Sequence, residues 1–139
     1  MIAVIRISGL VKIPGVVQET LFRMRLRRKY SLIFLHPTPV NMKLLNKVRN
    51  YVAYGDINEK TLLELIEKRA ESVDKKKVDA KMIVSHLEKK SLSSLGLKPF
   101  IRLHPPRGGI DAKKHFGVSK KAVLGDNKEK INDLIRRML

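Results

Sequence analysis

The sequence contains no cysteine and no tryptophan, and aromatic residues make up only 5% of its 139 positions. Without cysteine, the chain has no disulfide, no cysteine-based metal site and no thiol nucleophile. The scarcity of aromatic side chains predicts a core built mainly from Leu, Ile and Val. A chain of this length is sufficient for one compact domain with a modest core.

Acidic residues are also scarce. The chain has 13 Asp and Glu against 30 Lys and Arg, which gives a formal net charge of +17 and a pI near 10.4. This charge exceeds what solubility requires and predicts a polyanionic partner whose phosphates neutralise it. A membrane surface is the rival polyanion, but the sequence has no long apolar run and no signal-peptide pattern in its first nine residues. We therefore expect a nucleic-acid partner, no membrane and a cytoplasmic location.

The positive charge is concentrated in two segments. Residues 1–56 hold 10 basic and 2 acidic residues, and residues 96–125 hold 7 basic and 1 acidic residue. Residues 57–95 are nearly balanced, with 9 basic and 7 acidic residues, which is typical of solvated helix surfaces. The two unbalanced segments are therefore the candidate contacts with a polyanion.

Patterns that support catalysis or metal binding are missing. No two of the four histidines have metal-ligand spacing on one helix, and carboxylates are rare in the basic segments. Phosphate loops of the Walker type and dinucleotide glycine fingerprints are absent too. We expect no enzyme, no metal, no cofactor and no small-molecule substrate.

The first 56 residues show the order strand, helix, strand, helix, strand. The first helix ends in a cluster of basic residues that suits its C-terminal dipole. Thr38 is suited to cap the second helix, because Pro39 follows at the first helical position. The expected strands are residues 2–7, 31–36 and 51–55, and the expected helices are residues 15–28 and one that begins after Thr38.

The sequence pattern after residue 56 predicts mainly helices. A third helix begins near residues 56–59, and Asp79 caps a fourth. Asp126 or Asn127 caps a final helix, in which Ile131, Leu134, Ile135 and Met138 form the apolar stripe. Between them we expect a charged connection at residues 74–77, a short strand at residues 100–103 and an irregular basic loop over residues 110–125.

The segment 103–109, Leu-His-Pro-Pro-Arg-Gly-Gly, is the most unusual in the chain. Two prolines stiffen its backbone, and two glycines allow the main chain to approach a ligand closely. His104 and Arg107 are then suited to hold a phosphate. A tight turn at the edge of the domain explains the same composition equally well.

The three tyrosines are candidates for stacking on nucleobases. Two of them lie in apolar patterns, however, which favours packing in the core. The residues concerned are Tyr30, Tyr51 and Tyr54.

Two separated blocks resemble one protein family. Residues 42–49, Met-Lys-Leu-Leu-Asn-Lys-Val-Arg, and residues 51–57, Tyr-Val-Ala-Tyr-Gly-Asp-Ile, resemble the large-subunit ribosomal protein that bacteria number thirty and eukaryotes number seven. Residues 99–109 resemble the signature of its archaeal and eukaryotic branch, and residues 129–138 resemble the last helix of that branch. The long basic N-terminal tail of the eukaryotic form is missing, so the resemblance is to the archaeal form.

The resemblance implies an α+β fold. Residues 1–57 would form a βαβαβ core, similar to the ferredoxin-like fold, with a three-stranded antiparallel sheet and helices on one face. Residues 58–139 would form a mostly helical extension that carries the basic loop and packs on the core as one compact unit. The resemblance also implies a ribosomal location, with large-subunit ribosomal RNA, nearby five-S RNA and neighbouring large-subunit proteins as partners.

The family's RNA face, carried onto this chain, implies contacts by basic helix ends and loops. The implied RNA-binding residues are Lys12, Arg23, Arg27, Arg28, Lys29, Lys43, Lys47, Arg49, Arg102, His104, Arg107, Lys113, Lys114, Lys120 and Lys121. Two other functions share part of this evidence. A free-standing RNA-binding regulator or RNA chaperone would have the same charge, and an RNA-processing enzyme would need a catalytic constellation that the sequence lacks.

Overall fold

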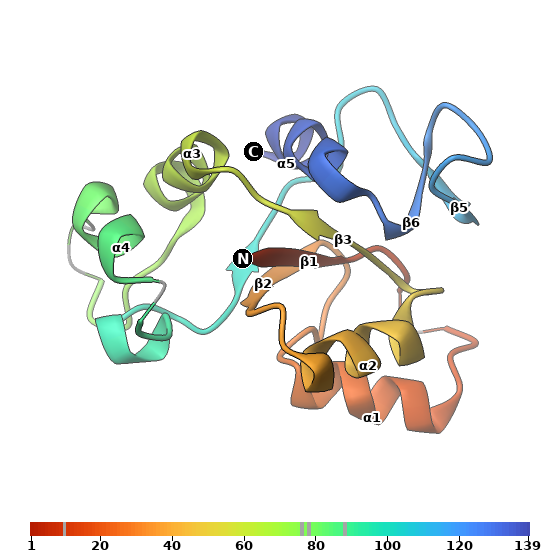
Figure 1. Cartoon of the computed structure of the whole chain (residues 1–139), viewed down its shortest axis with the longest axis horizontal. Helices are drawn as coiled ribbons and strands as arrows, with labels where there is room; N and C mark the ends of the chain where they lie inside the picture. The colour runs from red at the N-terminus through yellow and green to blue at the C-terminus, as the bar shows by residue number, and fades with distance from the viewer. Residues whose placement is uncertain (10, 76, 78, 88) are drawn as a thin grey trace.

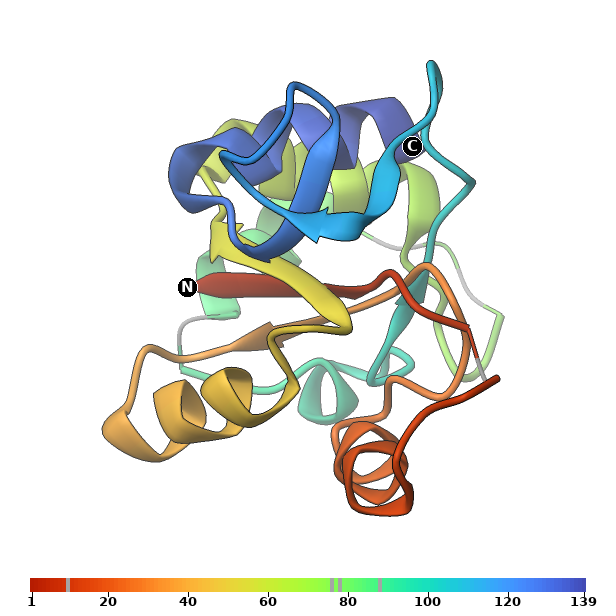
Figure 2. The same cartoon turned by 90° about the vertical axis from the view of Figure 1, so that its right-hand side faces the viewer.

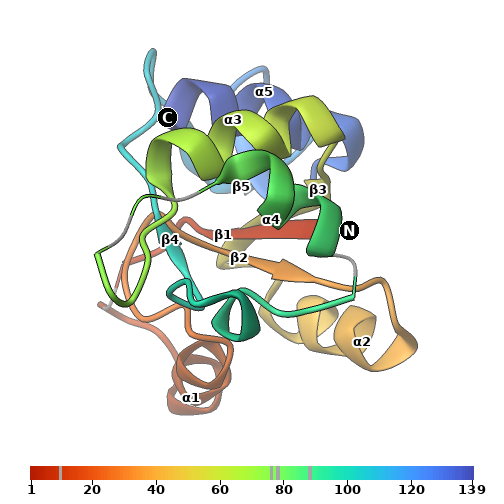
Figure 3. The same cartoon turned by 90° about the vertical axis from the view of Figure 1, so that its left-hand side faces the viewer.

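The computed structural model describes residues 1–9, 11–75, 77, 79–87 and 89–139. Lys76, in the predicted charged connection, lies outside the described residues. One sheet runs through the molecule, with α1 (Gly15–Arg23) and α2 (Pro39–Val48) on one face and α3 (Glu59–Arg69) and α5 (Ile131–Met138) on the other (Figures 1 and 3). The chain therefore folds as three layers.

The sheet has six strands among the described residues, in the order β4-β2-β1-β3-β6-β5. Their bounds are β1 Ile2–Arg6, β2 Ser31–Leu35, β3 Val52–Asp56, β4 Ile101–Arg102, β5 Asp111–His115 and β6 Ala122–Asp126. The remaining elements are α4 (Ala80–His86) and two short 3-10 turns, Ser93–Leu95 and Lys128–Lys130. The α+β class is confirmed.

The expected three-stranded sheet is too small. Antiparallel pairing of β1 with both β2 and β3 forms the expected centre, but β4 adds to β2 and β6 adds to β3, with β5 beyond it. A sheet of three strands would leave the backbone groups of β2 and β3 unpaired along two open edges. The extension pairs with both edges, which is why it contains strands as well as helices.

The two helices of residues 1–57, α1 and α2, lie on one face of the sheet, and helices of the extension cover the other face. All five residues of β1 are buried, and alternate side chains enter different cores. Ile2 and Val4 pack with α1 and α2, whereas Ala3 and Ile5 pack with the helices of the extension. Because both faces of this strand are apolar, both need a covering layer.

Residues 110–125 are not an irregular loop. Figure 2 shows β5 and β6 side by side beneath α5, where β6 continues the sheet in parallel with β3. Ala122, Val123 and Leu124 are buried, and this short apolar run was the available signal for a strand. The sequence of β5, Asp-Ala-Lys-Lys-His, has no such pattern, because β5 is an edge strand held by backbone pairing.

Helix starts were predicted more accurately than helix ends. The Thr38 side chain accepts a hydrogen bond from the Asn41 backbone N–H, and Asp79 does the same for Met82, so these two predicted caps are confirmed. The final helix begins at Ile131 without a side-chain cap, so the cap predicted at Asp126 or Asn127 is wrong. The first helix ends at Arg23 rather than near residue 28. The five residues that follow it form a separate, irregular segment.

A buried polar side chain joins the extension to the centre of the sheet. Asn132 of α5 accepts a hydrogen bond from the Asn58 backbone N–H at 2.9 Å and donates one to the Asp56 carbonyl at 3.1 Å. Gly55 lies beneath the same junction, where a Cβ atom would come within 2.3 Å of the Lys128 carbonyl oxygen. The close packing of α5 on β3 therefore depends on these positions.

Candidate nucleic-acid interface

All fifteen residues implied as RNA contacts are exposed in the folded chain. Thirteen of them fall into three separate groups rather than one site. The groups are residues 23–28 at the end of α1 together with β4, the outer face of α2, and β5 with the loops that precede β5 and β6.

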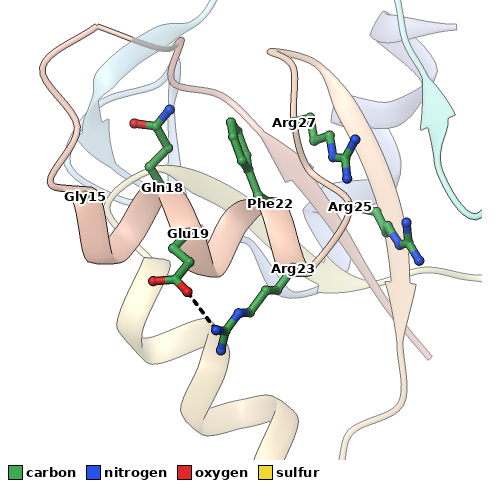
Figure 4. Close-up of a pocket in the computed structure, with 7 residues that line it drawn as sticks. All are labelled: Gly15, Gln18, Glu19, Phe22, Arg23, Arg25 and Arg27. Atoms are coloured by element: carbon green, nitrogen blue, oxygen red, sulfur yellow. Dashed lines mark hydrogen bonds and ion pairs between the residues drawn. The ribbon is translucent and has the colours of Figure 1, made fainter.

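The first group lines two adjoining recesses that share Arg25 and Arg27. The larger recess, of about 540 Å³, also contains Arg23 and Phe22, and Figure 4 shows it along α1. The smaller one, of about 230 Å³, contains Arg28, Phe100 and Arg102. We call the two recesses together the arginine groove, after Arg23, Arg25, Arg27, Arg28 and Arg102.

The conformation at the end of α1 determines the shape of the arginine groove. The Leu26 backbone N–H donates to the Leu21 carbonyl at 2.9 Å, and the Arg25 N–H donates to the Phe22 carbonyl at 3.1 Å. These two bonds form a Schellman motif, whose characteristic C′ residue adopts the left-handed conformation and is usually glycine. Here Arg25 occupies that position, with φ of 67°. Leu21 and Leu26 are both fully buried, which completes the hydrophobic contact of the motif.

The sheet brings the second basic segment of the chain to the same groove. β4 pairs with β2 so that Ser31 faces Arg102 in the ladder. The Arg102 guanidinium lies 5.6 Å from the centre of the Phe100 ring, which restricts where the side chain points. Two basic segments that are far apart in the sequence therefore contribute to one surface.

A buried arginine supports the groove from within the fold. The Arg6 side chain is fully buried and donates hydrogen bonds to the Leu26 carbonyl at 2.7 Å, the Ser8 carbonyl at 2.9 Å and the Gly9 carbonyl at 3.0 Å. Burial lowers the pKa of this guanidinium from its ordinary value. Arg6 thereby ties the loop before α1 to the segment after it.

The arginines of the groove are largely uncompensated. Glu19 is the acidic residue that lines it, and this carboxylate is paired with Arg23 at 2.7 Å on the surface. Across the part of the chain that the structure describes, the Arg25, Arg27 and Arg28 side chains have no ion pair or hydrogen bond. Guanidinium groups in this state can bind phosphate oxygens through two parallel hydrogen bonds.

The second group lies on α2. Lys43 and Lys47 are one helical turn apart and exposed, whereas Leu45 and Val48 are buried against the sheet. Arg49 follows as the C-terminal cap residue and is exposed as well. The predicted division of this helix into a packed face and a basic face is confirmed.

Two predicted contacts near α1 belong to none of these groups. Lys12 is exposed in the loop before α1 and has a φ of 58°, in the left-handed region. Lys29 lies over the Tyr30 ring, with its ammonium nitrogen 5.0 Å from the ring centre.

The loop 104–109 is held against the end of α5. The His104 backbone N–H donates to the Met138 carbonyl at 2.9 Å, and the Arg107 N–H donates to the Arg137 carbonyl at 3.0 Å. In return, the Arg137 guanidinium donates to the Arg107 carbonyl at 2.8 Å and to the Gly109 carbonyl. The segment is therefore a tight turn fixed to a helix end, and the Arg107 side chain remains exposed on it.

The lysines predicted as contacts in the second basic segment lie on β5 and in the loop that follows it. Lys113, Lys120 and Lys121 line one open recess of about 640 Å³. Lys121 also donates to the Gly108 carbonyl at 3.0 Å, so it braces the loop 104–109 as well. Lys114 lies 3.9 Å from the Asp111 carboxylate, a weak surface pair.

Several residues of this interface were missing from the sequence-based set. Arg25 belongs to the basic run 23–29 but was not selected, and its left-handed backbone has no sequence signal. Phe22 is exposed in the groove although the helical pattern gives no reason for an aromatic residue there. The supporting role of Arg6 could not be predicted from the sequence, because this residue lies within an apolar strand.

Other expected features can be compared with the described residues. Tyr54 is buried in the core, as predicted, and burial followed by the nearby Asp126 charge raises the pKa of its hydroxyl. No cluster of three or more metal-ligating side chains occurs within the described ranges. Among the helices of that same part of the chain, none is long and apolar enough to cross a membrane.

Comparison with known proteins identifies similar chains. Residues 2–52 match the family model described as ribosomal protein L30p/L7e. Proteins named large ribosomal subunit protein uL30 are similar over 99% of this chain: those of Pyrobaculum islandicum (34% identical, 93% of its length covered), Aeropyrum pernix (34%, 98%) and Nanoarchaeum equitans (35%, 97%). The similarity to archaeal relatives extends through the extension as well as the first 56 residues.

Proposed function

The chain belongs to the L30p/L7e family of large-subunit ribosomal proteins, and we propose that it binds ribosomal RNA through the arginine groove, the basic face of α2 and the loops around β5. Members of this family are structural constituents of the ribosome rather than enzymes. Family membership removes the RNA-processing enzyme from consideration and makes a free-standing regulator unnecessary as an explanation of the charge.

One observation supports the proposal most directly. The pairing of β2 with β4 places Arg102 beside the basic segment that follows α1, so both unbalanced segments of the sequence supply the groove. Packing in the core does not require five exposed arginines around one groove. A polyanion that neutralises them does explain their gathering.

The mechanism is passive. Lysine and arginine side chains neutralise phosphates and release the counterions condensed on RNA, which supplies most of the free energy of binding. The turn at residues 104–109 and the Schellman motif hold the backbone at their arginines in place before RNA arrives, so little backbone entropy is lost on binding. Double-stranded RNA presents backbone and shape rather than base edges in its deep groove, so recognition follows surface contour.

The resemblance to the family extends the proposal to the surroundings of the bound chain. The five-S RNA would lie close by, and neighbouring large-subunit proteins would contact the faces that RNA leaves free. The binding surfaces would belong to two parts, residues 1–57 and residues 58–139, packed as one compact unit. The continuous six-stranded sheet supports their packing as one unit, because strands from both parts pair within it.

Sedimentation of the large subunit through a sucrose gradient at increasing salt tests the proposal. The native chain should remain with the subunit, and the double variant Lys43→Ala, Lys47→Ala and the single variant Arg107→Ala should dissociate at lower salt. The matched control is Lys60→Ala, Lys68→Ala, which removes the same charge from the exposed side of α3. Equal loss of the α2 variant and the control would show that net charge, rather than the α2 face, determines retention.

A further inference from the structure

Phe22 is an exposed aromatic residue that the core does not use. The residue is 38% exposed, and neither core cluster of the described residues includes it. The preceding residue, Leu21, already fills the buried position at the end of α1 and is fully buried. Phe22 is therefore free to contact a ligand with one face of its ring.

The surroundings of Phe22 are those of a binding site for a charged, planar ligand. In Figure 4 the ring stands between Gln18 on one side and Arg27 on the other, and all three line the larger recess of the arginine groove. The recess is open to solvent, with a volume of about 540 Å³. An apolar ring beside unpaired guanidinium groups and one amide is suited to a nucleobase joined to a phosphate backbone.

The shape of the groove favours a strand over a free nucleotide. The larger recess continues through Arg25 and Arg27 into the smaller one, which is lined by Arg28 and Arg102. Arginines in both recesses can therefore follow consecutive phosphates of one backbone. A base held in the larger recess must be unpaired, because a base inside a duplex has no free face to stack on a protein ring.

We propose that the arginine groove holds an unpaired ribosomal RNA nucleotide, with its base stacked on Phe22 and its neighbouring phosphates bound by Arg25 and Arg27. This inference rests on the proposed RNA-binding function and adds the class of RNA that the groove accepts. Gln18, on the other side of the ring, would hydrogen-bond the edge of the base. Duplex RNA would then bind elsewhere, on α2 and on the loops around β5.

Because the sequence contains no tryptophan, a tryptophan introduced at position 22 provides a direct fluorescence probe. In the full-length variant Phe22→Trp, the new indole is the sole tryptophan, and a base stacked on it should quench its fluorescence. The matched control is Met82→Trp on α4, away from the proposed RNA-binding surfaces, where Met82 is 55% exposed. Short single-stranded oligouridylate should quench the tryptophan at position 22 and leave the one at position 82 unchanged, whereas duplex RNA of equal length should quench neither.

Binding measurements with Phe22→Leu complete the test. Leucine keeps the residue apolar but removes the ring, so the affinity for the single strand should fall about 5- to 100-fold. The dependence of affinity on salt should stay the same, because no charge is lost. Binding without quenching at position 22, or unchanged affinity of Phe22→Leu, would overturn the stacking proposal and leave RNA binding by phosphate contacts intact. Failure of the native chain to bind ribosomal RNA would instead refute the proposed function, and the inference with it.

Discussion

Ser31 of β2 and Arg102 of β4 face each other in one antiparallel ladder, and this pairing joins the two basic segments of the chain. The contact is short, since β4 consists of only Ile101 and Arg102. Ile101 is buried in the core while Arg102 is exposed, so one residue anchors the strand and the next faces the groove. The interface is therefore assembled by the sheet rather than by a continuous stretch of sequence.

Replacing Arg102 by alanine should weaken RNA binding without unfolding the protein. The side chain is exposed, so the free energy of unfolding should change by less than about 0.5 kcal/mol. Loss of one phosphate contact should reduce the slope of log affinity against log salt by about one. Filter binding to large-subunit RNA at several salt concentrations measures this slope. The variant Lys81→Ala, on α4, removes the same charge away from the groove and should leave the slope unchanged.

Arg25→Gly should separate stability from binding. Arg25 has a left-handed backbone, which costs about 1–2 kcal/mol for a residue with a Cβ atom. Glycine removes this cost but loses about 0.5–1 kcal/mol of unfolded-state entropy, so a net stabilisation of roughly 0.5 kcal/mol is expected. Affinity for RNA should fall because the guanidinium is gone. Thermal melting and filter binding on the same sample measure both effects, and a destabilised Arg25→Gly would contradict the Schellman assignment.

Arg6→Met should destabilise the fold and the groove together. Methionine fits a similar volume but leaves the Ser8, Gly9 and Leu26 carbonyls without their donor. Buried hydrogen bonds to a charged group contribute about 1.5–3 kcal/mol each. The Ser8 and Gly9 carbonyls are only part-buried and can bind water instead, so we expect a total loss of roughly 3 kcal/mol in the free energy of unfolding. Urea unfolding measures the loss. Hydrogen exchange should also show faster exchange at the Leu26 amide, and no change in either measurement would exclude a supporting role for Arg6.

Arg137→Ala should loosen the turn at residues 104–109. The Arg137 side chain donates to the Arg107 and Gly109 carbonyls, and without it the turn keeps its backbone bonds to α5 alone. We expect about 1 kcal/mol of lost stability and faster hydrogen exchange at the Arg107 amide. Arg136→Ala is the matched control, because Arg136 is exposed and forms a long ion pair with Glu64 at 3.8 Å. The control should leave exchange in the turn unchanged.

Gly55→Ala should be among the most damaging single-methyl changes in the chain. The new Cβ would lie 2.3 Å from the Lys128 carbonyl oxygen and 2.9 Å from the Ile131 Cβ atom, so α5 must move away from β3. Overpacking of this kind costs about 1–3 kcal/mol. Gly15→Ala is the control, since a Cβ there meets nothing within 4 Å, and it should leave the melting temperature unchanged or slightly raised.

The central fold could be predicted because its signals are local. The apolar run of β1, the Thr38 cap with Pro39 after it and the i, i+4 spacing of Lys43 and Lys47 each depend on neighbouring residues. Turn and cap chemistry works over three or four residues, and so does helical periodicity. These features can therefore be recognised from short stretches of sequence, without knowledge of the tertiary structure.

The outer strands could not be predicted in the same way. β5 pairs with β6 through backbone groups, which every residue carries, so its Lys-rich sequence contains no sign of the ladder. The end of α1 was placed too late because the basic run that follows Arg23 is compatible with a helix. Only burial of Leu26, together with its hydrogen bond to Leu21, ends the helix where it does.

The sequence by itself determined the charge, the absence of thiol chemistry, the family resemblance and the exposure of the lysines on α2, since these follow from composition and local periodicity. Tertiary structure alone decided that Arg102 joins the segment after α1, that Arg6 supports this segment from inside and that Phe22 remains exposed between Gln18 and Arg27. The physical reason is that strand pairing and core packing are long-range. They decide which distant residues meet, and they leave no periodic pattern at the residues that they bring together.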